Sequence, residues 1–333
     1  MATPRLPPLP SIRDLLRLYR LRAVQQLSQN FLLDSGVCAR LARAAGPLRD
    51  AHVCEVGPGP GSVTRAILAQ RPAGVTLVEK DTRFLPALLM LREAAQPCPV
   101  RIVAGDVLLY DMEAAFPVSP TPWEEPCTSA YILGNLPFSI STPLVVRWLR
   151  DVSKRQGAWK HGRVRMALTF QKEVAERLAA EAGGDQRCRL SVVAQAFCQV
   201  QHRFTLGGHV FTPRPDVDVG VVVLTPLREP RVDVPFETLE KVARGLFNMR
   251  QKSILRGTQT LYPEPVRRQL AADTLRLAEL DPACRPFQLT VEEVGRLCRA
   301  YLDICSVHPQ LAQYEYRLHG KHGGLDLAQG VSL

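Results

Sequence analysis

The sequence lacks any apolar run long enough to cross a bilayer, which takes about 20 consecutive apolar residues. Its mean hydropathy is −0.04, and 46 % of its residues are hydrophobic. These values are typical of a soluble globular protein. A chain of 333 residues is long enough for one large or two moderate domains, each with a hydrophobic core.

Metal-binding and disulfide patterns are also missing. The nine cysteines are scattered, and no two of them form a Cys-x-x-Cys pair. This spacing argues against a zinc site and against a disulfide framework, and it favours a reducing compartment. We therefore expect no metal centre.

Acidic residues are outnumbered by basic ones, which are mostly arginine. The net charge is +10 and the isoelectric point is near 9.4. Such a surface suits an anionic partner, and RNA fits better than a membrane because arginine contacts phosphate in a bidentate manner. The alternative is a solvated basic surface with no partner.

The first 33 residues hold five arginines and a single acidic residue, Asp14. Apolar residues between 11 and 23 follow helical spacing, with arginines on another face. An amphipathic, arginine-rich start is typical of a mitochondrial presequence, which we place over residues 1–27. The alternative, a helix packed on the catalytic domain, is compatible with partial retention of the signal.

A dinucleotide-type Gly-x-Gly-x-x-Gly motif is absent, but a related turn is present at Cys54–Ser62, between an apolar run and an amphipathic run. Its pattern is Gly-x-Gly-x-Gly, and Pro58 and Pro60 remove two N–H donors. Fewer donors for a pyrophosphate favour a cofactor with a ribose and no phosphate, such as S-adenosylmethionine. The alternative is an ordinary strand-to-helix turn.

Two further apolar runs end in acidic residues. Glu79 follows 74–78, and its carboxylate is placed to accept hydrogen bonds from both ribose hydroxyls. Asp106 follows 100–103 and is placed to accept from an adenine amino group, although a loop or capping role is the alternative. With Lys80 and Val107 beside them, with Glu55 and Gly57 on the methionine side, and with Asn135 at the end of the next strand, these residues form the predicted cofactor site.

The fourth predicted strand, 130–134, leads into Asn135-Leu136-Pro137-Phe138. The lone pair of an adenine amino nitrogen is delocalised, and acceptors on its two N–H groups favour a nucleophilic geometry. The Asn135 side-chain oxygen and a backbone carbonyl of Leu136 or Pro137 are candidate acceptors, and Phe138 is placed to stack on the base. The alternative is a plain turn after a strand.

Five segments in this order resemble the KsgA/Dim family of ribosomal RNA adenine dimethyltransferases, and the mitochondrial members most of all. They are 25–32 (QQLSQNFL), 55–61 (EVGPGPG), 135–138 (NLPF), 171–175 (QKEVA) and 211–218 (FTPRPDVD). The resemblance implies N6,N6-dimethylation of two adjacent adenosines in a hairpin loop near the 3′ end of small-subunit rRNA, in support of small-subunit assembly in the mitochondrial matrix. It also implies that Gln29, Asn30 and Leu32 help to cover the cofactor. One departure is Gly220, where many relatives carry serine.

The alternation of strands and helices predicts an α/β fold, a class I (Rossmann-like) S-adenosylmethionine-dependent methyltransferase domain over 28–226. A small all-helical RNA-binding domain is predicted at 227–318 and a disordered tail at 319–333. The helices expected from periodicity and capping are 34–45, 62–70, 82–95, 141–152, 171–182, 236–248, 250–259, 264–272 and 290–305. The last two strands are expected at 199–206 and 217–224, with an antiparallel arrangement.

Six residues are candidate RNA contacts, each with a plainer alternative such as solvated charge or hydrophobic packing. They are Lys172, Arg177, Phe211, Arg250, Lys252 and Arg256. The basic, glycine-rich loop 183–189 is a candidate mobile lid or phosphate contact.

Two other functions remain as alternatives. One is a nucleic-acid-binding factor, in ribosome assembly or mitochondrial transcription, built on a methyltransferase scaffold; in either case we expect a monomer. The intact Glu79, Asp106 and Asn135 argue against a degenerate site. The other is a nicotinamide-dependent oxidoreductase, which the glycine spacing and the two prolines of the turn disfavour.

Overall fold

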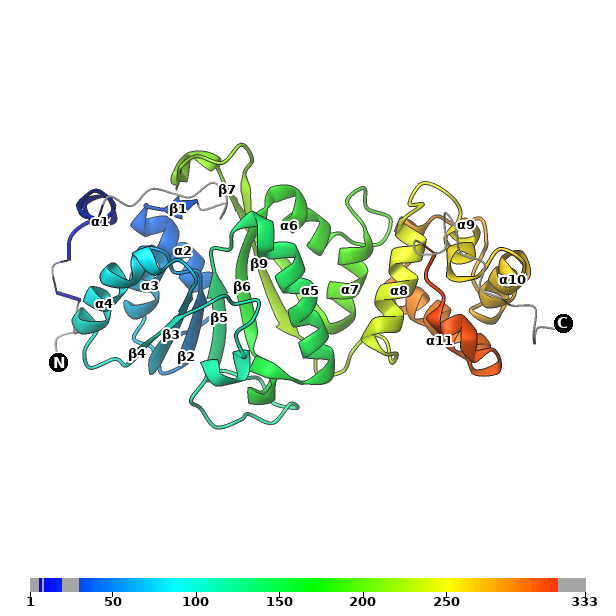
Figure 1. Cartoon of the computed structure of the whole chain (residues 1–333), viewed down its shortest axis with the longest axis horizontal. Helices are drawn as coiled ribbons and strands as arrows, with labels where there is room; N and C mark the ends of the chain where they lie inside the picture. The colour runs from blue at the N-terminus through cyan, green and yellow to red at the C-terminus, as the bar shows by residue number, and fades with distance from the viewer. Residues whose placement is uncertain (1–5, 8, 20–29, 317–333) are drawn as a thin grey trace. The chain divides into compact units, whose positions relative to one another are not determined.

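The computed structural model describes residues 6–7, 9–19 and 30–316. The chain forms two compact units (Figure 1). The sheet unit comprises 1–179 and 197–230, and the helical unit comprises 180–196 and 231–333. The predicted boundary at 226/227 treats the chain as linear, whereas the structure adds 180–196 to the helical unit, because this segment packs with the C-terminal helices.

The sheet unit is built on a seven-stranded sheet in the order β4-β3-β2-β5-β6-β9-β7. The strands from β4 to β6 in this order are parallel, and β9 and β7 run antiparallel to their neighbours. Their bounds are β2 His52–Val56, β3 Gly74–Glu79, β4 Val100–Ala104, β5 Ala130–Gly134, β6 Arg165–Gln171, β7 Cys198–Leu206 and β9 Val219–Pro226. This architecture is the class I methyltransferase fold with additional C-terminal helices, as predicted.

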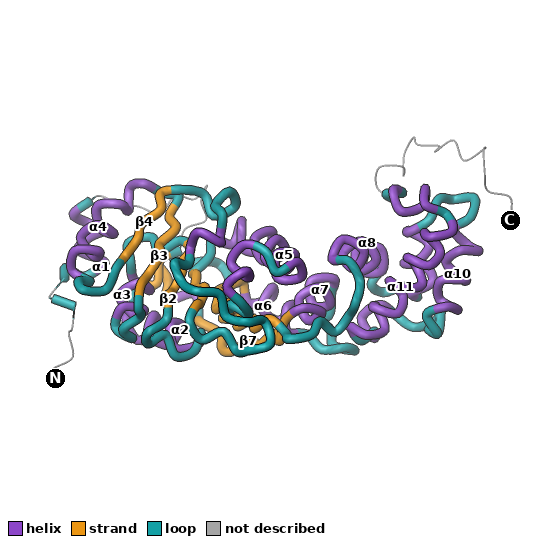
Figure 2. The backbone as a smooth tube through the Cα atoms, turned by 90° about the horizontal axis from the view of Figure 1, so that it is seen from below, coloured by secondary structure: helices purple, strands orange, loops and turns teal. Residues whose placement is uncertain are grey.

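Helices connect β2 to β3, β3 to β4 and β5 to β6 (Figure 2). Their apolar residues are buried. The helices of this unit are α1 Ile12–Leu18, α2 Ser35–Ala44, α3 Ser62–Leu68, α4 Leu85–Ala94, α5 Phe138–Lys154 and α6 Lys172–Ala179. The central strands β2, β3 and β5 are buried along their whole length, which is why their sequences read as nearly continuous apolar runs.

The parallel register brings the carboxyl ends of β2, β3 and β5 to one edge of the sheet. The glycine turn, Glu79 and Asn135 each follow one of these ends, so that residues far apart in sequence share one site. A small antiparallel pair closes this edge: β1 (Phe31–Leu32) pairs with β8 (Phe211–Thr212). The pair places Asn30 and Phe211 at the same site.

The helical unit contains α7 Arg189–Phe197, apart from its last residue, together with α8 Phe236–Phe247, α9 Ile254–Thr258, α10 Arg267–Leu277 and α11 Val291–Val307. α7 is absent from the helices expected from sequence, because its residues show no clear amphipathic period. α10 extends further toward the C-terminus than expected, and α5 begins at Phe138 rather than at residue 141. Pro143 lies inside α5, where its missing N–H removes one hydrogen bond of the helix.

The loop 183–189, expected as a lid or phosphate contact, is fixed within the helical unit. Arg187 is 1 % exposed, and its Nη1 donates to the Ala180 carbonyl and to Gln195 Oε1, both at 2.8 Å. The Arg250 guanidinium donates to the carbonyls of Asp185 and Arg187. These internal contacts assign the loop's charged residues to structure.

Within the described residues, no helix has both the length and the apolar character needed to traverse a bilayer.

The glycine at position 220 has a packing reason. A Cβ placed on Gly220 in β9 would lie 2.3 Å from the Cβ of Ala175 on α6 and 3.0 Å from His202 Nε2. Real Cβ atoms do not approach so closely, so a serine at this position requires a different neighbour on α6.

We therefore predict that Gly220→Ala destabilises the sheet unit by about 1–3 kcal/mol through overpacking. The cost should be smaller in an Ala175→Gly background, because the closest contact is removed. All three tryptophans, Trp123, Trp148 and Trp159, lie in the sheet unit, so tryptophan fluorescence during urea unfolding reports its stability. Equal costs in both backgrounds would contradict this explanation.

Candidate functional site

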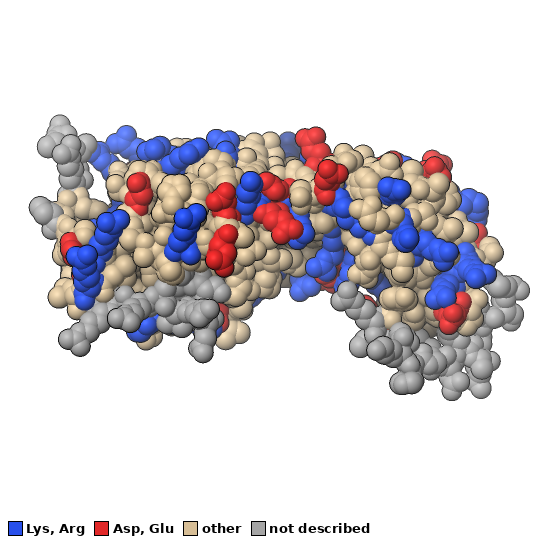
Figure 3. All heavy atoms as spheres, turned by 90° about the horizontal axis from the view of Figure 1, so that it is seen from above, with Lys and Arg blue, Asp and Glu red and all other residues tan. Residues whose placement is uncertain are grey.

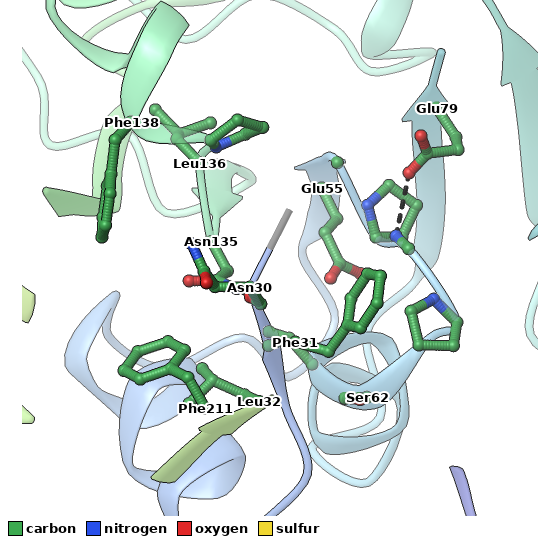
Figure 4. Close-up of a pocket in the computed structure, with 16 residues that line it drawn as sticks. Asn30, Phe31, Leu32, Glu55, Ser62, Glu79, Asn135, Leu136, Phe138 and Phe211 are labelled. Carbon is green, nitrogen blue, oxygen red and sulfur yellow. Dashed lines mark hydrogen bonds between the residues drawn. The ribbon is translucent and has the colours of Figure 1, made fainter. Parts of the chain in front are cut away.

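Two adjoining hollows lie at the carboxyl edge of the parallel strands, and both belong to the sheet unit. The first is lined by Asn30, Phe31, Leu32, Glu55, Gly57, Pro58, Gly59, Pro60, Ser62, Val63, Glu79, Asn135, Leu136, Pro137, Phe138 and Phe211 (Figure 4). The second is lined by residues that include Gly57, Glu79, Lys80, Asp106, Val107 and Pro137. Because Gly57, Glu79 and Pro137 line both, a single elongated ligand can extend from one hollow into the other.

None of the three glycine N–H groups of the turn is free to bind a pyrophosphate. The N–H groups of Gly57, Gly59 and Gly61 donate to the Val78 carbonyl, to Glu79 Oε2 and to the Pro58 carbonyl, each at 2.9 Å. The two residues between them are prolines. Gly57, Gly59 and Gly61 have φ values of 66°, 53° and 89°, so the turn requires glycine at these positions. The turn therefore suits a ligand without phosphates.

Glu79 stands where the two hollows join. Its Oε2 accepts the Gly59 N–H and its Oε1 accepts the Asp81 N–H at 2.8 Å. The backbone N–H of Lys80 also interacts with this carboxylate. A carboxylate offers about four acceptor positions, so acceptor capacity remains for a hydroxyl donor of a ligand. Burial raises the pKa of Glu79 despite these bonds, because the charged form loses its hydration.

The second hollow carries an exposed ion pair at its rim. Lys80 Nζ lies 2.8 Å from Asp106 Oδ2, and Asp106 Oδ1 accepts the Leu108 N–H. Lys80 lowers the pKa of Asp106, so this carboxylate is ionised at neutral pH. Asp106 thus has one oxygen on the lysine and one on its own loop, and Val107 provides an apolar surface beside it.

Glu55 is the most deeply buried carboxyl of the site, at 1 % exposure. Thr64 donates to its Oε2 at 2.6 Å. Burial raises the pKa of Glu55 to about 8, and the nearby Glu79 contributes in the same direction. At neutral pH the Glu55 side chain is therefore mostly a protonated acid.

Ser62 is a polar group without a protein partner. Its Oγ is buried in the first hollow and makes no hydrogen bond to any residue that the structure describes. A buried hydroxyl without a partner is costly. This donor at the first residue of α3 is available to a ligand carboxylate.

The Asn135 amide is held from both sides. Its Nδ2 donates to the Asn30 carbonyl at 2.8 Å, and its Oδ1 accepts from Thr169 Oγ1 at 3.0 Å. A carbonyl only accepts, so the Asn30 contact determines which way the amide faces. Thr169, on β6 and fully buried, also accepts the Leu136 N–H at 3.0 Å, which directs its hydroxyl proton to Asn135. One lone pair of Asn135 Oδ1 remains for a ligand.

The two backbone carbonyls after Asn135 differ in availability. The Pro137 carbonyl accepts from the N–H groups of Ile140 and Ser141 as α5 begins, each at 3.1 Å. No described backbone bond occupies the Leu136 carbonyl. Leu136 is therefore the better candidate for the second acceptor.

Two phenylalanines stand on the side of the first hollow away from Glu79, as Figure 4 shows. Phe138 is the first residue of α5, and Phe211 opens β8 and is 4 % exposed. Asn135 lies near both in the same view. Together the three residues provide a flat apolar surface and a hydrogen-bond acceptor, which suit a planar base.

The structure thus gathers most of the predicted site residues. Asn30, Leu32, Glu55, Gly57, Glu79, Asn135, Leu136, Phe138 and Phe211 line the first hollow, and Lys80, Asp106 and Val107 line the second. Gln29 lies outside the described residues. The sequence analysis did not single out Phe31, Ser62, Thr64 or Thr169 as site residues. Of these, Ser62 had a signal in the sequence, because it directly follows the last glycine of the turn.

The predicted RNA contacts outside the hollow have mixed surroundings. Lys172 and Arg177 pair with Glu176 and Glu173 along α6. Arg250 is engaged with loop carbonyls and stacks on Phe287, with its Cζ 5.1 Å from the ring centroid. Lys252 and Arg256 are exposed.

Known proteins share both the sequence and the fold. A family model described as ribosomal RNA adenine dimethylase matches residues 20–284. The protein named dimethyladenosine transferase 1, mitochondrial, is 51 % identical in Macaca fascicularis and 50 % identical in Homo sapiens, over 95 % of this chain and 92 % of each relative. A dimethyladenosine transferase structure from Plasmodium falciparum covers 81 % of this chain and 96 % of its own, with a TM-score of 0.64 at 19 % identity, which is a likeness of fold.

The pKa of Glu55 makes a prediction about stability. An unfolded glutamate releases its proton near pH 4.5, whereas the folded Glu55 holds it up to about pH 8. The free energy of unfolding should therefore lose its Glu55 contribution as pH rises from about 4.5 to 8. Glu55→Gln keeps the shape and the Thr64 contact but cannot ionise.

In urea unfolding followed by tryptophan fluorescence, Glu55→Gln should gain stability relative to the wild type between pH 5 and pH 8. A pH-independent difference between the two proteins would show that Glu55 ionises normally in the folded state.

Proposed function

Because the chain belongs to the ribosomal RNA adenine dimethylase family, we propose that it methylates N6 of two adjacent adenosines, twice each, in the 3′-terminal hairpin loop of mitochondrial small-subunit rRNA. The protein is an rRNA adenine dimethyltransferase, and its methyl donor is S-adenosylmethionine. Its relatives over 95 % of the chain carry mitochondrial names, so we assign it to the mitochondrial matrix and to small-subunit assembly.

The residues present fit the cofactor. The free acceptor positions of Glu79 suit the two ribose hydroxyls, and the second hollow, with Asp106 and Val107, suits the adenine. Ser62 Oγ and the Glu55 carboxyl are available to the amino-acid end. The three glycine N–H groups of the turn are already bonded within the protein, which disfavours a phosphate at this position. When bound, S-adenosylmethionine supplies a methyl group on a sulfonium, which is electrophilic without help from a metal.

The protein's part in the reaction is to position and polarise the adenine amino group. Phe138 and Phe211 hold the base by its faces, which an unpaired loop adenosine offers more cheaply than a duplex does. Asn135 Oδ1 and the Leu136 carbonyl accept the two N6 protons, so that the nitrogen lone pair turns toward the methyl donor. No strong base is needed, because the proton becomes acidic only once the nitrogen carries the new bond, and alignment accounts for most of the rate.

The observation that carries this proposal is the Asn135 amide, held between the Asn30 carbonyl and Thr169 at the end of β5. A mere turn residue needs no such constraint. An acceptor fixed in advance loses no freedom when the base arrives, which is the condition for electrostatic catalysis.

We expect Asn135→Ala to lower kcat by about 100-fold or more, by the measure of other lost polar contacts to a reacting group. Affinities for the hairpin and for S-adenosylmethionine should change little. The assay uses methyl-labelled S-adenosylmethionine with a hairpin that has two adjacent loop adenosines, and identifies N6,N6-dimethyladenosine by mass spectrometry of the digested RNA. Turnover comparable to the wild type would remove Asn135 from the mechanism.

A wild-type protein that binds both substrates but transfers no label should next be given immature small subunits. Transfer there means that the assembled particle is the substrate. No transfer in either case favours a binding factor on a methyltransferase scaffold and contradicts the proposal.

Thr169 provides a second test, because it acts through Asn135. Thr169→Val removes the hydroxyl and with it the bonds to Asn135 Oδ1 and to the Leu136 N–H. It should lower kcat by roughly tenfold while both KM values stay the same, since the orientation of the acceptors is lost. Thr169→Ser keeps the hydroxyl and should restore most of the rate. If the valine and serine variants lose equal activity, the loss reflects packing in β6 and not the hydrogen bond.

A further inference from the structure

A third hollow of the sheet unit is strongly basic and lies beside the edge strand β7. It is lined by Arg40, Arg43 and Ala44 of α2 and by 201–204 of β7, which include Arg203, His202 and Phe204. None of the described residues that line it is acidic. All three arginines are exposed. This set, the arginine hollow, is separate from the residues that line the cofactor and target-base hollows.

Contacts with neighbouring side chains hold two of the three arginines in position. The Arg40 guanidinium lies over the Phe204 ring, with its Cζ 3.8 Å from the ring centroid. Stacking uses the face of the guanidinium and leaves its N–H edge free, which is the edge that binds phosphate. Arg203 Nη1 donates to Gln201 Oε1 at 3.1 Å, which steadies a second guanidinium. Across the described ranges, none of the three has a carboxylate at ion-pair distance.

The sheet register places this hollow close to the target-base site. Phe204 on β7 pairs with Val221 on β9, and Val221 pairs in turn with Thr169 on β6. Two strand spacings separate Phe204 from Thr169, roughly 10 Å. The hydroxyl of Thr169 contacts Asn135. A strand of RNA covers such a distance within two or three nucleotides.

We propose that the arginine hollow binds backbone phosphates of the RNA strand that flanks the target adenosines. The inference rests on the proposed function, since the RNA is the methylation substrate. Protection of an edge strand from unwanted pairing would explain Arg203. Edge-strand protection does not explain why two arginines of a helix line the same hollow, or why none of its described lining residues is acidic.

Phosphate binding at this position has a functional consequence. The base pocket offers flat faces and two acceptors, which any adenine satisfies. Contacts to the neighbouring backbone keep the loop in one register, so that two adjacent adenosines can be presented in turn without release of the stem. The arginine hollow would therefore contribute to RNA binding and leave the chemical step unaffected.

The test removes two of the charges with Arg43→Gln/Arg203→Gln, which spares the Arg40–Phe204 stack. The KM for the hairpin should rise roughly tenfold at 0.15 M salt, and the salt dependence of hairpin binding should lose about two units of slope. The kcat at saturating RNA and the affinity for S-adenosylmethionine should stay unchanged, because neither arginine lines those hollows.

The matched control is Arg49→Gln/Arg92→Gln, which removes the same charge from two residues that line none of the three hollows. Arg49 lies in the loop before the central strand β2, and Arg92 lies in the last turn of α4, which packs on β4 at the edge of the sheet opposite β7. The control should leave the KM and the salt slope near wild-type values. Equal effects of the two double variants would overturn the proposal, since net charge alone would then explain them.

The same assay separates this inference from the proposed function. A wild-type protein that transfers no methyl group to hairpin or particle defeats both. A wild type that methylates normally, with an Arg43→Gln/Arg203→Gln variant of unchanged KM and slope, defeats only the arginine hollow. If that variant binds the hairpin normally but binds immature small subunits weakly, the hollow contacts a protein, which also overturns the phosphate assignment.

Discussion

The hydrogen bonds on either side of the Asn135 amide are the constraint on which the site depends. They require Asn30 to lie against the end of β5, which the β1–β8 pair achieves by joining residues 31–32 to 211–212. They also require β6 to pair beside β5 in a register that puts Thr169 level with the turn. The β1–β8 pairing also brings Phe211 to the hollow. A single side-chain amide is thus positioned by four strands from distant parts of the chain.

Accounting for the polar groups of the glycine turn separates this site from nucleotide sites of similar appearance. In a phosphate-binding turn, successive N–H groups point at the ligand. Here the prolines have none, and the three glycines give theirs to Val78, Glu79 and Pro58. The bond from Gly59 also holds the Glu79 carboxylate in place at the junction of the two hollows. A turn of this kind therefore fixes the position of a carboxylate, whereas a phosphate-binding turn of similar sequence forms an anion site. The five residues from 57 to 61 account for this difference in the class of ligand.

Much of this arrangement was predictable from sequence, because it follows from local rules. Parallel strands bring their carboxyl ends to the same edge of a sheet. Glu79, Asn135 and the glycine turn each stand at such an end, so their proximity could be predicted without knowledge of side-chain contacts. Thr169 and Thr64 escaped prediction because a threonine in an apolar strand or helix looks like any other, and its partner lies 34 or 9 residues away. The partners of Arg187, in the loop 183–189, escaped prediction for a related reason. It donates to the Ala180 carbonyl and to Gln195 Oε1, which only the folded helical unit brings together, so this use of its charge is not visible in the sequence.

Glu55 and Glu79 show why the cofactor belongs to this fold energetically as well as geometrically. Both carboxyls are buried, and burial raises both pKa values, because neither has a cationic partner in the described chain. The protein alone thus holds two acids in an environment that disfavours their charge, beside a serine hydroxyl with no acceptor. A ligand with hydroxyl donors, an ammonium group and a carboxylate would supply donors to the two acids and an acceptor to the serine hydroxyl. The cost of burying the acids is incurred in folding and recovered on binding, so that affinity comes from groups already in position.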